Sequence, residues 1–287
     1  MAVLLKGAPV ATAINARSKE TVFELQQHSI IPTLAIVRVG ERPDDLSYER
    51  NAMKRCASVG VKVRNIVFPE EVSQEEFYGE IDRLNQDDTV HGVLIFRPLP
   101  KHLDNEKARN AVIAEKDVDG CTDLSLAGVF TGSGVGFAPC TAQAVMEVLS
   151  YYGISVEGKD AVVVGRSLVV GRPVSLLLMR ANATVTVCHT KTNGLSEKAK
   201  RADILVACSG QMESIGRDYI REGQTVLDVG ISWNEEKQKL CGDVLFEEAE
   251  RVVDAITPVP GGIGSVTTSV LVSHVVESAK RRSGFMF

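Results

Sequence analysis

Short apolar runs alternate along the chain with longer segments whose apolar residues recur at the spacing of a helix. In the first half, the runs PTLAIVRVG (32–40), VKVRNIVF (61–68) and HGVLIFRPLP (91–100) predict strands. Helix-period segments at 47–60 and 73–86 stand between these runs, the second with an acidic first turn. This alternation predicts a mostly parallel sheet with right-handed crossovers.

A glycine- and threonine-rich interval, LAGVFTGSGVGFAPCT (126–141), interrupts the pattern and marks a domain boundary, a loop-rich site wall, or both. Strand and helix segments then resume as KDAVVVG, GRPVSLLLMRA, ATVTVCHT, LSEKAKRAD, ILVACSG and QTVLDVGIS. These units predict a second α/β block of ordinary domain size. The last apolar stripe, TTSVLVSHVVESAKRR, has a basic end that suits a helix C-terminus.

Composition and charge exclude several classes of protein. A chain of 287 residues, 44% hydrophobic and 24% charged, is typical of a globular protein with two domains. Its net charge of −5 provides no electrostatic footprint for nucleic acid, and no apolar run approaches the length of a membrane span. The opening MAVLLKGAPVA has too short an apolar stretch for a secretory signal, so we expect a cytoplasmic protein.

Cysteine usage agrees with a reducing compartment. The six cysteines stand far apart, without a CxxC pair or histidines at metal-ligand spacing. We therefore expect free thiols, no disulfide framework and no metal site.

The segment VVVGRSLVVGRP (162–173) is the strongest sign of a ligand site. A buried-type strand ends in a glycine turn at Gly165-Arg166-Ser167, and a helix follows from Gly171. Free backbone N–H groups and a helix N-terminus favour a phosphate group above the strand. The order of the glycines is not GxGxxG, and the alternative is a plain strand-to-helix turn.

One βα unit later, TVTVCHTKT (184–192) ends a strand without a carboxylate. In a dinucleotide fold this position meets the adenosine ribose, and an acidic residue there favours NAD. The hydroxyl of Thr190 and the cations of Arg166 and Lys191 suit a 2′-phosphate instead. This pattern favours NADP over NAD, with NAD left open.

Two further motifs offer ligand contacts. The loop TPVPGGIGSVT (257–267) combines prolines and glycines into a rigid backbone that a flat ligand can approach closely. In KDVDG (116–120), a carboxylate that accepts paired N–H bonds is the functional interpretation, and a solvated turn is the alternative. Asp119 is the better candidate because Gly120 leaves its approach open.

Together these motifs resemble the methylenetetrahydrofolate dehydrogenase/cyclohydrolase family. The resemblance rests on GRSLVVGRP, KDVDG, PCT (139–141), DVG (228–230), GDV (242–244) and TPVPGGIG, in the family's order over essentially the whole chain. It implies a folate domain at 1–141, a Rossmann-type NADP domain at 142–267, and a final helix at 268–287 that returns to the first domain. It also implies a homodimer, with folate in the cleft between the two domains.

The resemblance assigns roles to individual residues. Tyr48 matches the active-site tyrosine beside the folate ring, and Asp119 matches the aspartate that anchors the pterin. The loop along the substrate corresponds to Pro260, Gly261, Gly262, Ile263 and Gly264. The dinucleotide contacts correspond to Gly165, Arg166, Ser167, Gly171, Thr190, Gly230 and Ile231.

Two departures fall where the family keeps its water chemistry. The family has a lysine four residues after the tyrosine and a supporting glutamine in the following strand, and here Ala52 and Phe96 stand at those places. A tyrosine hydroxyl with an ordinary pKa of about 10 is a poor acid–base group without a neighbouring cation. We therefore predict a dehydrogenase with weak or absent cyclohydrolase activity.

Three alternatives remain at this stage. The enzyme is fully bifunctional if Lys54 or Arg97 supplies the missing positive charge. A non-catalytic NADP- or folate-binding regulator would form no methenyltetrahydrofolate. A two-domain amino-acid or hydroxy-acid dehydrogenase would leave PCT and TPVPGGIG unexplained.

Overall fold

The computed structural model describes residues 1–284 and divides the chain into two compact units. Unit 1 comprises Met1–Ala11 and Thr141–Thr267. Unit 2 comprises Thr12–Cys140 and the segment that begins at Thr268. The boundaries fall within or beside three helices: α1 (Gly7–Gln27), α6 (Cys140–Tyr151) and α10 (Gly264–Ser283).

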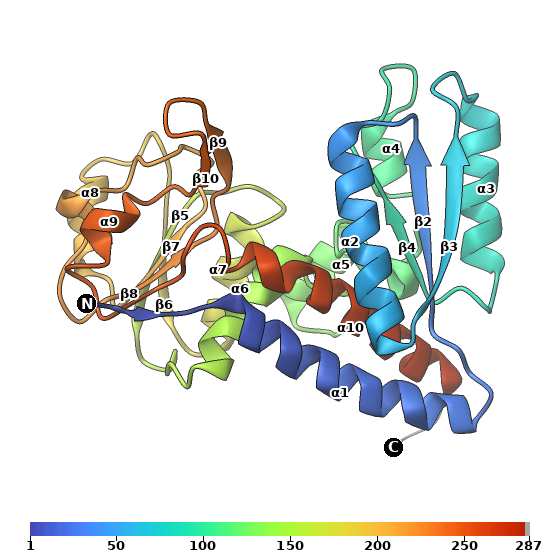
Figure 1. Cartoon of the computed structure of the whole chain (residues 1–287), viewed down its shortest axis with the longest axis horizontal. Helices are drawn as coiled ribbons and strands as arrows, with labels where there is room; N and C mark the ends of the chain where they lie inside the picture. The colour runs from blue at the N-terminus through green and yellow to red at the C-terminus, as the bar shows by residue number, and fades with distance from the viewer. Residues whose placement is uncertain (285–287) are drawn as a thin grey trace. The chain divides into compact units, whose positions relative to one another are not determined.

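Unit 2 is built on a three-stranded parallel sheet with the order β3-β2-β4. Its strands are β2 (Thr33–Val39), β3 (Lys62–Phe68) and β4 (Gly92–Ile95). Every residue of the central strand β2 is buried, which explains its continuous apolar run. Two long helices, α2 (Pro43–Val59) and α3 (Gln74–Gln86), make the crossovers (Figure 1).

The ends of these helices follow from local chemistry. At the start of α3 the Ser73 hydroxyl accepts the Glu76 N–H at 3.1 Å. At the end of α2, Gly60 adopts φ 95° and donates its N–H to the Cys56 carbonyl. The C-terminus of α3 is closed by the buried ammonium of Lys116, which donates to three main-chain carbonyls between residues 84 and 87.

Shorter elements complete unit 2. They are α4 (Asn105–Arg109), the 3₁₀ turn η1 (Ala114–Lys116) and α5 (Asp123–Thr131). Its core includes Ala35, Val37, Phe68, Phe77, Ile81, Leu84, Val93 and Leu103.

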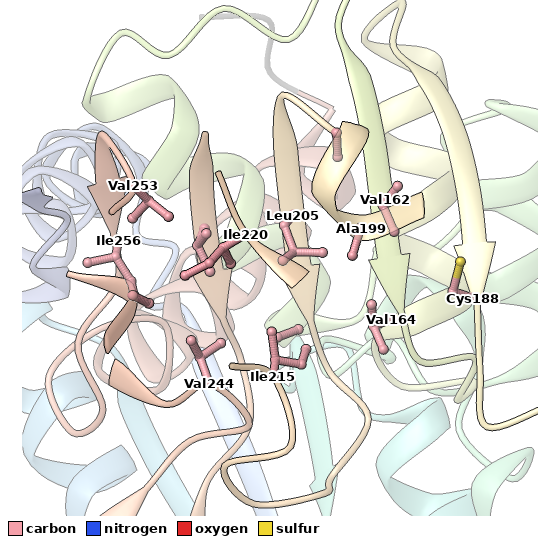
Figure 2. Packing of buried hydrophobic residues seen from close by; sticks show 14 of the residues in the cluster. Val162, Val164, Cys188, Ala199, Leu205, Ile215, Ile220, Val244, Val253 and Ile256 are labelled. Atoms are coloured by element: carbon pink, nitrogen blue, oxygen red, sulfur yellow. The ribbon is translucent and has the colours of Figure 1, made fainter. Parts of the chain in front are cut away.

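Unit 1 contains a six-stranded sheet with the order β1-β11-β8-β7-β5-β6, parallel throughout. The strands are β1 (Val3–Leu4), β5 (Asp160–Val164), β6 (Thr184–Cys188), β7 (Ile204–Ala207), β8 (Thr225–Asp228) and β11 (Ala255–Ile256). The helical elements are α7 (Gly171–Arg180), α8 (Leu195–Arg201), η2 (Arg217–Tyr219) and α9 (Phe246–Ala249). Side chains from neighbouring strands, such as Val162, Leu205 and Ile256, form one apolar layer (Figure 2).

The two-domain α/β prediction is confirmed, and the structure differs from the sequence analysis in two details. Residues 1–11 lie in unit 1, not in the first domain, because β1 pairs in parallel with β11 about 250 positions later in sequence. The predicted strand 224–232 ends at Asp228, and Ser232–Asn234 forms a separate strand, β9. That strand pairs antiparallel with β10 (Lys239–Cys241) in a hairpin.

Three properties of the described residues bear on function. No helix within 1–284 is sufficiently long and apolar to cross a membrane. All six cysteines are free. Among the same residues, no three or more His, Cys, Asp or Glu side chains gather in a way that would hold a metal ion.

Candidate functional site

Tyr48 lies on α2, is partly buried and packs against the ring of Phe96. Its ring meets Phe96 edge to face, with ring centroids 5.7 Å apart and an interplanar angle of 83°. Burial, followed by the nearby acidic groups Cys140 and Asp119, raises the pKa of the phenol above its ordinary value. A hydrogen bond with the Thr268 side chain opposes this shift.

The position one turn after Tyr48 holds no charged group. Ala52 is completely buried, and Phe96 is only 8% exposed. Lys54 is exposed, which agrees with its place on another face of the helix. Neither Ala52 nor Phe96 can provide the cation that would lower the pKa of the phenol.

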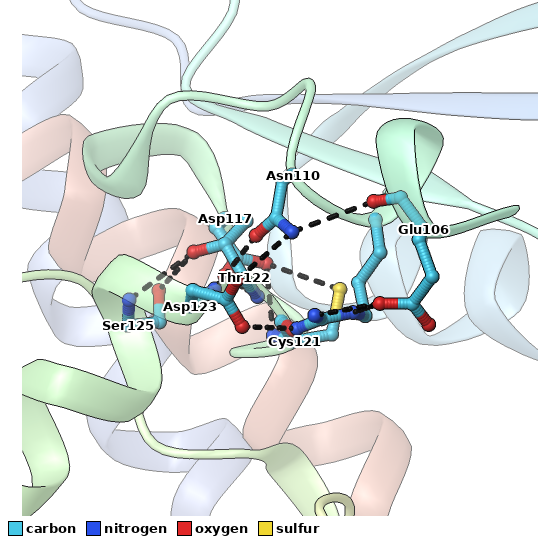
Figure 3. Close-up of polar contacts among 8 residues, drawn as sticks. Glu106, Asn110, Asp117, Cys121, Thr122, Asp123 and Ser125 are labelled. Atoms are coloured by element: carbon cyan, nitrogen blue, oxygen red, sulfur yellow. Dashed lines mark hydrogen bonds and ion pairs between the residues drawn. The ribbon is translucent and has the colours of Figure 1, made fainter. Parts of the chain in front are cut away.

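The two carboxylates of KDVDG have different tasks. Asp117 is 1% exposed and accepts the main-chain N–H groups of Gly120, Cys121 and Thr122 at 2.8–3.2 Å. Figure 3 shows this carboxylate among the residues of the turn, with the Thr122 hydroxyl continuing toward Ser125 at the start of α5. Asp117 therefore builds the turn that presents Asp119.

The main-chain bonds of this turn go to Asp117 and not to Asp119. Burial, and then the neighbouring Asp117, raises the pKa of its carboxyl to about 6, while Arg97 and a hydrogen bond with Cys140 act in the opposite direction. Gly120, at φ 73°, is required beside it, because a Cβ there would lie 2.5 Å from the Ala138 carbonyl oxygen. Asp119 is therefore a carboxylate with a raised pKa beside a closely packed turn.

Cys140 and His274 both contact the main chain next to Asp119, at Val118, and the sequence analysis gave neither of them a role. The Cys140 thiol donates to the Val118 carbonyl at 3.2 Å, and His274 Nδ1 lies 2.8 Å from the same oxygen. His274 also stacks on Phe137. Cys140 belongs to the quoted PCT motif, whereas no local signal marks His274, more than a hundred residues away.

In unit 1, the glycine turn forms a cradle that larger residues would fill. Gly165 follows β5 at φ 142°, and a Cβ on it would lie 2.3 Å from the Cys208 carbonyl oxygen. A Cβ on Gly171 would lie 2.4 Å from the Gly165 carbonyl oxygen. Arg166 and Ser167 are exposed, and the Ser167 hydroxyl accepts the Val170 N–H at 3.1 Å just before α7. This geometry fits a phosphate-bearing cofactor that approaches main chain.

The other dinucleotide candidates lie at the same edge of the sheet. Strand β6 pairs with β5, so Thr190, exposed after β6, shares the carboxyl edge with Gly165. Gly230 and Ile231 follow β8 at this edge, and Ile231 is 61% exposed. The structure thus brings together candidates that lie up to 66 positions apart in the sequence.

The loop 260–264 offers mainly backbone. Pro260, Gly261 and Gly264 are exposed, whereas Ile263 is only 2% exposed. Gly261 has φ 101°, and its carbonyl accepts the Gly7 N–H at 2.8 Å. A Cβ on Gly262 would lie 2.5 Å from the Pro258 carbonyl oxygen, which explains its glycine.

These features define a two-domain α/β enzyme with a dinucleotide-binding sheet. The models of two family domains match the chain: the tetrahydrofolate dehydrogenase/cyclohydrolase catalytic domain at residues 5–119, and the NAD(P)-binding domain at residues 139–283. The chain is 48% identical over 287 residues, all of both chains, to the "Bifunctional protein FolD" of Carboxydothermus hydrogenoformans. It is 48% identical over 284 residues, 99% of both chains, to the protein of the same name from Clostridium kluyveri.

A solved structure of a related enzyme has the same fold as this chain. The bifunctional FolD methylenetetrahydrofolate dehydrogenase/cyclohydrolase from Campylobacter jejuni superimposes with a TM-score of 0.94 at 39% identity, covering 98% of this chain and 100% of that one. The chain belongs to the tetrahydrofolate dehydrogenase/cyclohydrolase family. The resemblance seen in the sequence is confirmed, and the protein is an enzyme with an NAD(P)-binding domain.

Proposed function

We propose that this enzyme oxidises 5,10-methylenetetrahydrofolate to 5,10-methenyltetrahydrofolate with NADP, and hydrolyses the product weakly or not at all. The observation that carries the second part is the apolar packing around Tyr48. Phe96 lies edge to face against the phenol, and Ala52 is completely buried one helical turn away. The chain has no acid–base pair at the place where the family keeps a lysine and a glutamine.

Oxidation asks little proton chemistry of the protein. A nitrogen lone pair of the substrate stabilises the cation that remains when hydride leaves the carbon between the two nitrogens. Bound NADP supplies the hydride acceptor. The chain must hold the substrate in place and exclude water, and we assign the anchoring of the pterin to Asp119.

Cofactor binding is assigned to the glycine cradle and its edge. At Gly165 and Gly171 the chain's own backbone packs so closely that a Cβ would not fit, which fixes the turn whose N–H groups we assign to a diphosphate. Arg166, Ser167 and Thr190 are exposed at the carboxyl edge, where they suit a 2′-phosphate. A relative from Trypanosoma brucei, 33% identical with a TM-score of 0.90, was solved with NADP, which supports the choice of NADP over NAD.

Hydrolysis has different requirements. Water must attack the methenyl carbon and lose a proton, and a ring nitrogen must gain one as its bond to carbon breaks. A positioned acid–base group contributes about 10²- to 10⁴-fold to such a step. Burial raises the pKa of the Tyr48 phenol, and this shift disfavours its action as the base.

The remaining assignments complete the proposal. The loop Pro260, Gly261, Gly262, Ile263 and Gly264 would lie along the folate and, since Ile263 is buried, would contact it through main chain. The active form would be a cytoplasmic homodimer, as in the family resemblance.

The competing proposal is a fully bifunctional enzyme, favoured by the names of the relatives from Carboxydothermus and Clostridium. A paired assay on purified protein decides between them. Methenyltetrahydrofolate is followed as it forms with NADP, and then supplied alone to follow its decay above the buffer rate. Oxidation with decay at the buffer rate supports the proposal, whereas hydrolysis at a rate similar to oxidation refutes its second part.

A further inference from the structure

Two loops at the carboxyl edge of the unit 1 sheet are tied together by a pair of buried aspartates. One loop, 208–210, follows β7, and the other, 229–231, follows β8. The aspartates are Asp228, the last residue of β8, and Asp243, which follows the hairpin strand β10. They are 3% and 0% exposed.

The Asp228 carboxylate accepts hydrogen bonds from three main-chain N–H groups. One oxygen, Oδ1, accepts the N–H groups of Gly230 and Asp243, each at 3.0 Å. The other, Oδ2, accepts the Val244 N–H at 3.0 Å. The carboxylate therefore joins the loop after β8 to the segment that follows β10.

Asp243 joins that segment to the loop after β7. Its Oδ2 accepts the Ser209 N–H at 2.6 Å, the Ser209 hydroxyl at 2.9 Å and the Gly210 N–H at 3.0 Å. Its Oδ1 is buried and has no hydrogen-bond partner among residues 1–284. The two carboxylates thus form one continuous bridge from the 208–210 loop to the 229–231 loop.

The motifs DVG (228–230) and GDV (242–244) each have a glycine directly beside the aspartate carboxylate of the other motif. A Cβ on Gly230 would lie 2.2 Å from Asp243 Oδ1. A Cβ on Gly242 would lie 2.0 Å from Asp228 Oδ2. The sequences DVG and GDV are therefore the two halves of a single interlocked structure, which explains the residue types of both.

The bridge ends at the point where strand order reverses. The chain passes from β5 to β6 on one side, whereas β7 lies on the other side of β5, and ligands of open α/β sheets bind outside the strands at such a point. The Cys208 main chain, directly before Ser209, lies so close to Gly165 that a Cβ on this glycine would be 2.3 Å from its oxygen. The 208–210 loop thus lies against the glycine cradle.

We propose that Asp228 and Asp243 are positioning residues for the dinucleotide: together they hold the 208–210 and 229–231 loops in the arrangement that receives NADP. This inference rests on the proposed dinucleotide site. Burying two carboxylates close together is costly, and packing alone would be served as well by uncharged residues. Five main-chain N–H groups and the Ser209 hydroxyl donate to the two carboxylates, and these six hydrogen bonds offset that cost. They also hold in place backbone that lies outside the regular strands and helices.

The test compares Asp228→Asn and Asp243→Asn with Asp254→Asn. Asp254 accepts the Gly223 N–H at 3.0 Å, a similar contact in the same unit, but it lies before β11 at the amino edge of the sheet. NADPH affinity is measured directly by fluorescence titration, without turnover, together with the KM for each substrate. Melting temperatures report stability separately.

We expect roughly 10- to 100-fold weaker NADPH binding in the Asp228 and Asp243 variants, from lost bonds to a charged acceptor. The KM for the folate should stay within about twofold, and Asp254→Asn should bind NADPH normally. Unchanged NADPH affinity in folded Asp228→Asn and Asp243→Asn overturns the inference, as does an equal rise in both KM values. If neither variant folds, Ser209→Ala removes a single bond to Asp243 and decides by the same titration.

A failure of the proposed function can be distinguished from a failure of this inference. If the proposed function is wrong, the unmodified enzyme itself binds no NADPH or forms no methenyltetrahydrofolate. Normal binding by the unmodified enzyme and by all variants refutes only the positioning role.

Discussion

Restoring the missing pair should convert this enzyme toward hydrolysis, and the structure sets the cost of doing so. The perturbation is Ala52→Lys together with Phe96→Gln. Ala52 is 0% exposed, so a lysine alone there buries an ammonium and overfills a packed site. Overpacking costs about 1–3 kcal/mol, and an unpaired buried charge adds several more. We expect Ala52→Lys alone to be strongly destabilised or unfolded.

Phe96→Gln alone has a different cost. The substitution removes a ring that is only 8% exposed, together with the edge-to-face contact of that ring with Tyr48. These two losses should lower the free energy of unfolding by about 2–4 kcal/mol. In the double variant the shorter amide provides room and a hydrogen-bond partner for the ammonium. The double variant should therefore be more stable than the sum of the single changes predicts, by about 0.5–3 kcal/mol of coupling.

The catalytic gain follows from the phenol. Burial now raises the pKa of Tyr48, and an ammonium beside it would lower that pKa again. We expect the decay of methenyltetrahydrofolate, followed by absorbance without NADP, to accelerate about 10²-fold or more over the unmodified enzyme. The matched control, Ala52→Met with Phe96→Gln, makes the same opening without a charge and should show no gain.

Two results would refute this reasoning. One is rapid hydrolysis by the unmodified enzyme. The other is an equal gain in the methionine control, which would show that access of water, not the cation, limits the reaction.

Three further predictions follow from single residues. Burial raises the pKa of Asp119 to about 6, and an ionised carboxylate is needed to accept N–H bonds from the folate. The KM for the folate should therefore rise by up to about tenfold per pH unit below 6, which initial rates from pH 5 to 8 test. Asp119→Asn should abolish this pH dependence. Lys116→Met removes the ammonium that donates to three carbonyls at the end of α3, and it should lower the free energy of unfolding by about 2–4 kcal/mol in urea titration. A loss below about 0.5 kcal/mol would contradict that role. Gly165→Ala places a methyl group 2.3 Å from the Cys208 carbonyl oxygen and should weaken NADPH binding at least about tenfold with the folate KM unchanged, so a rise in both would point to general misfolding.

Local sequence determined most of the secondary structure and the residue types of the site. The mostly apolar run 33–39 could be predicted as a strand from its β-branched residues, and Ser73 and Gly60 mark helix ends through their own side-chain and backbone chemistry. The glycine turn at Gly165 could be read directly, since a strand, a glycine and a helix stand next to each other in the chain. The absence of a lysine at Ala52 was equally visible.

Only the tertiary structure decided which groups meet. It divided the two carboxylates of KDVDG, giving the main-chain bonds of the turn to Asp117 and not to Asp119, and it moved the first eleven residues into unit 1 through the pairing of β1 with β11. It also joined Asp228 to the segment around Asp243, a link between two short motifs that are each unremarkable alone. The physical reason is range: periodicity, capping and turn preferences act over a few residues, whereas burial, charge coupling and the partners of a buried carboxylate depend on chain segments that only folding brings together.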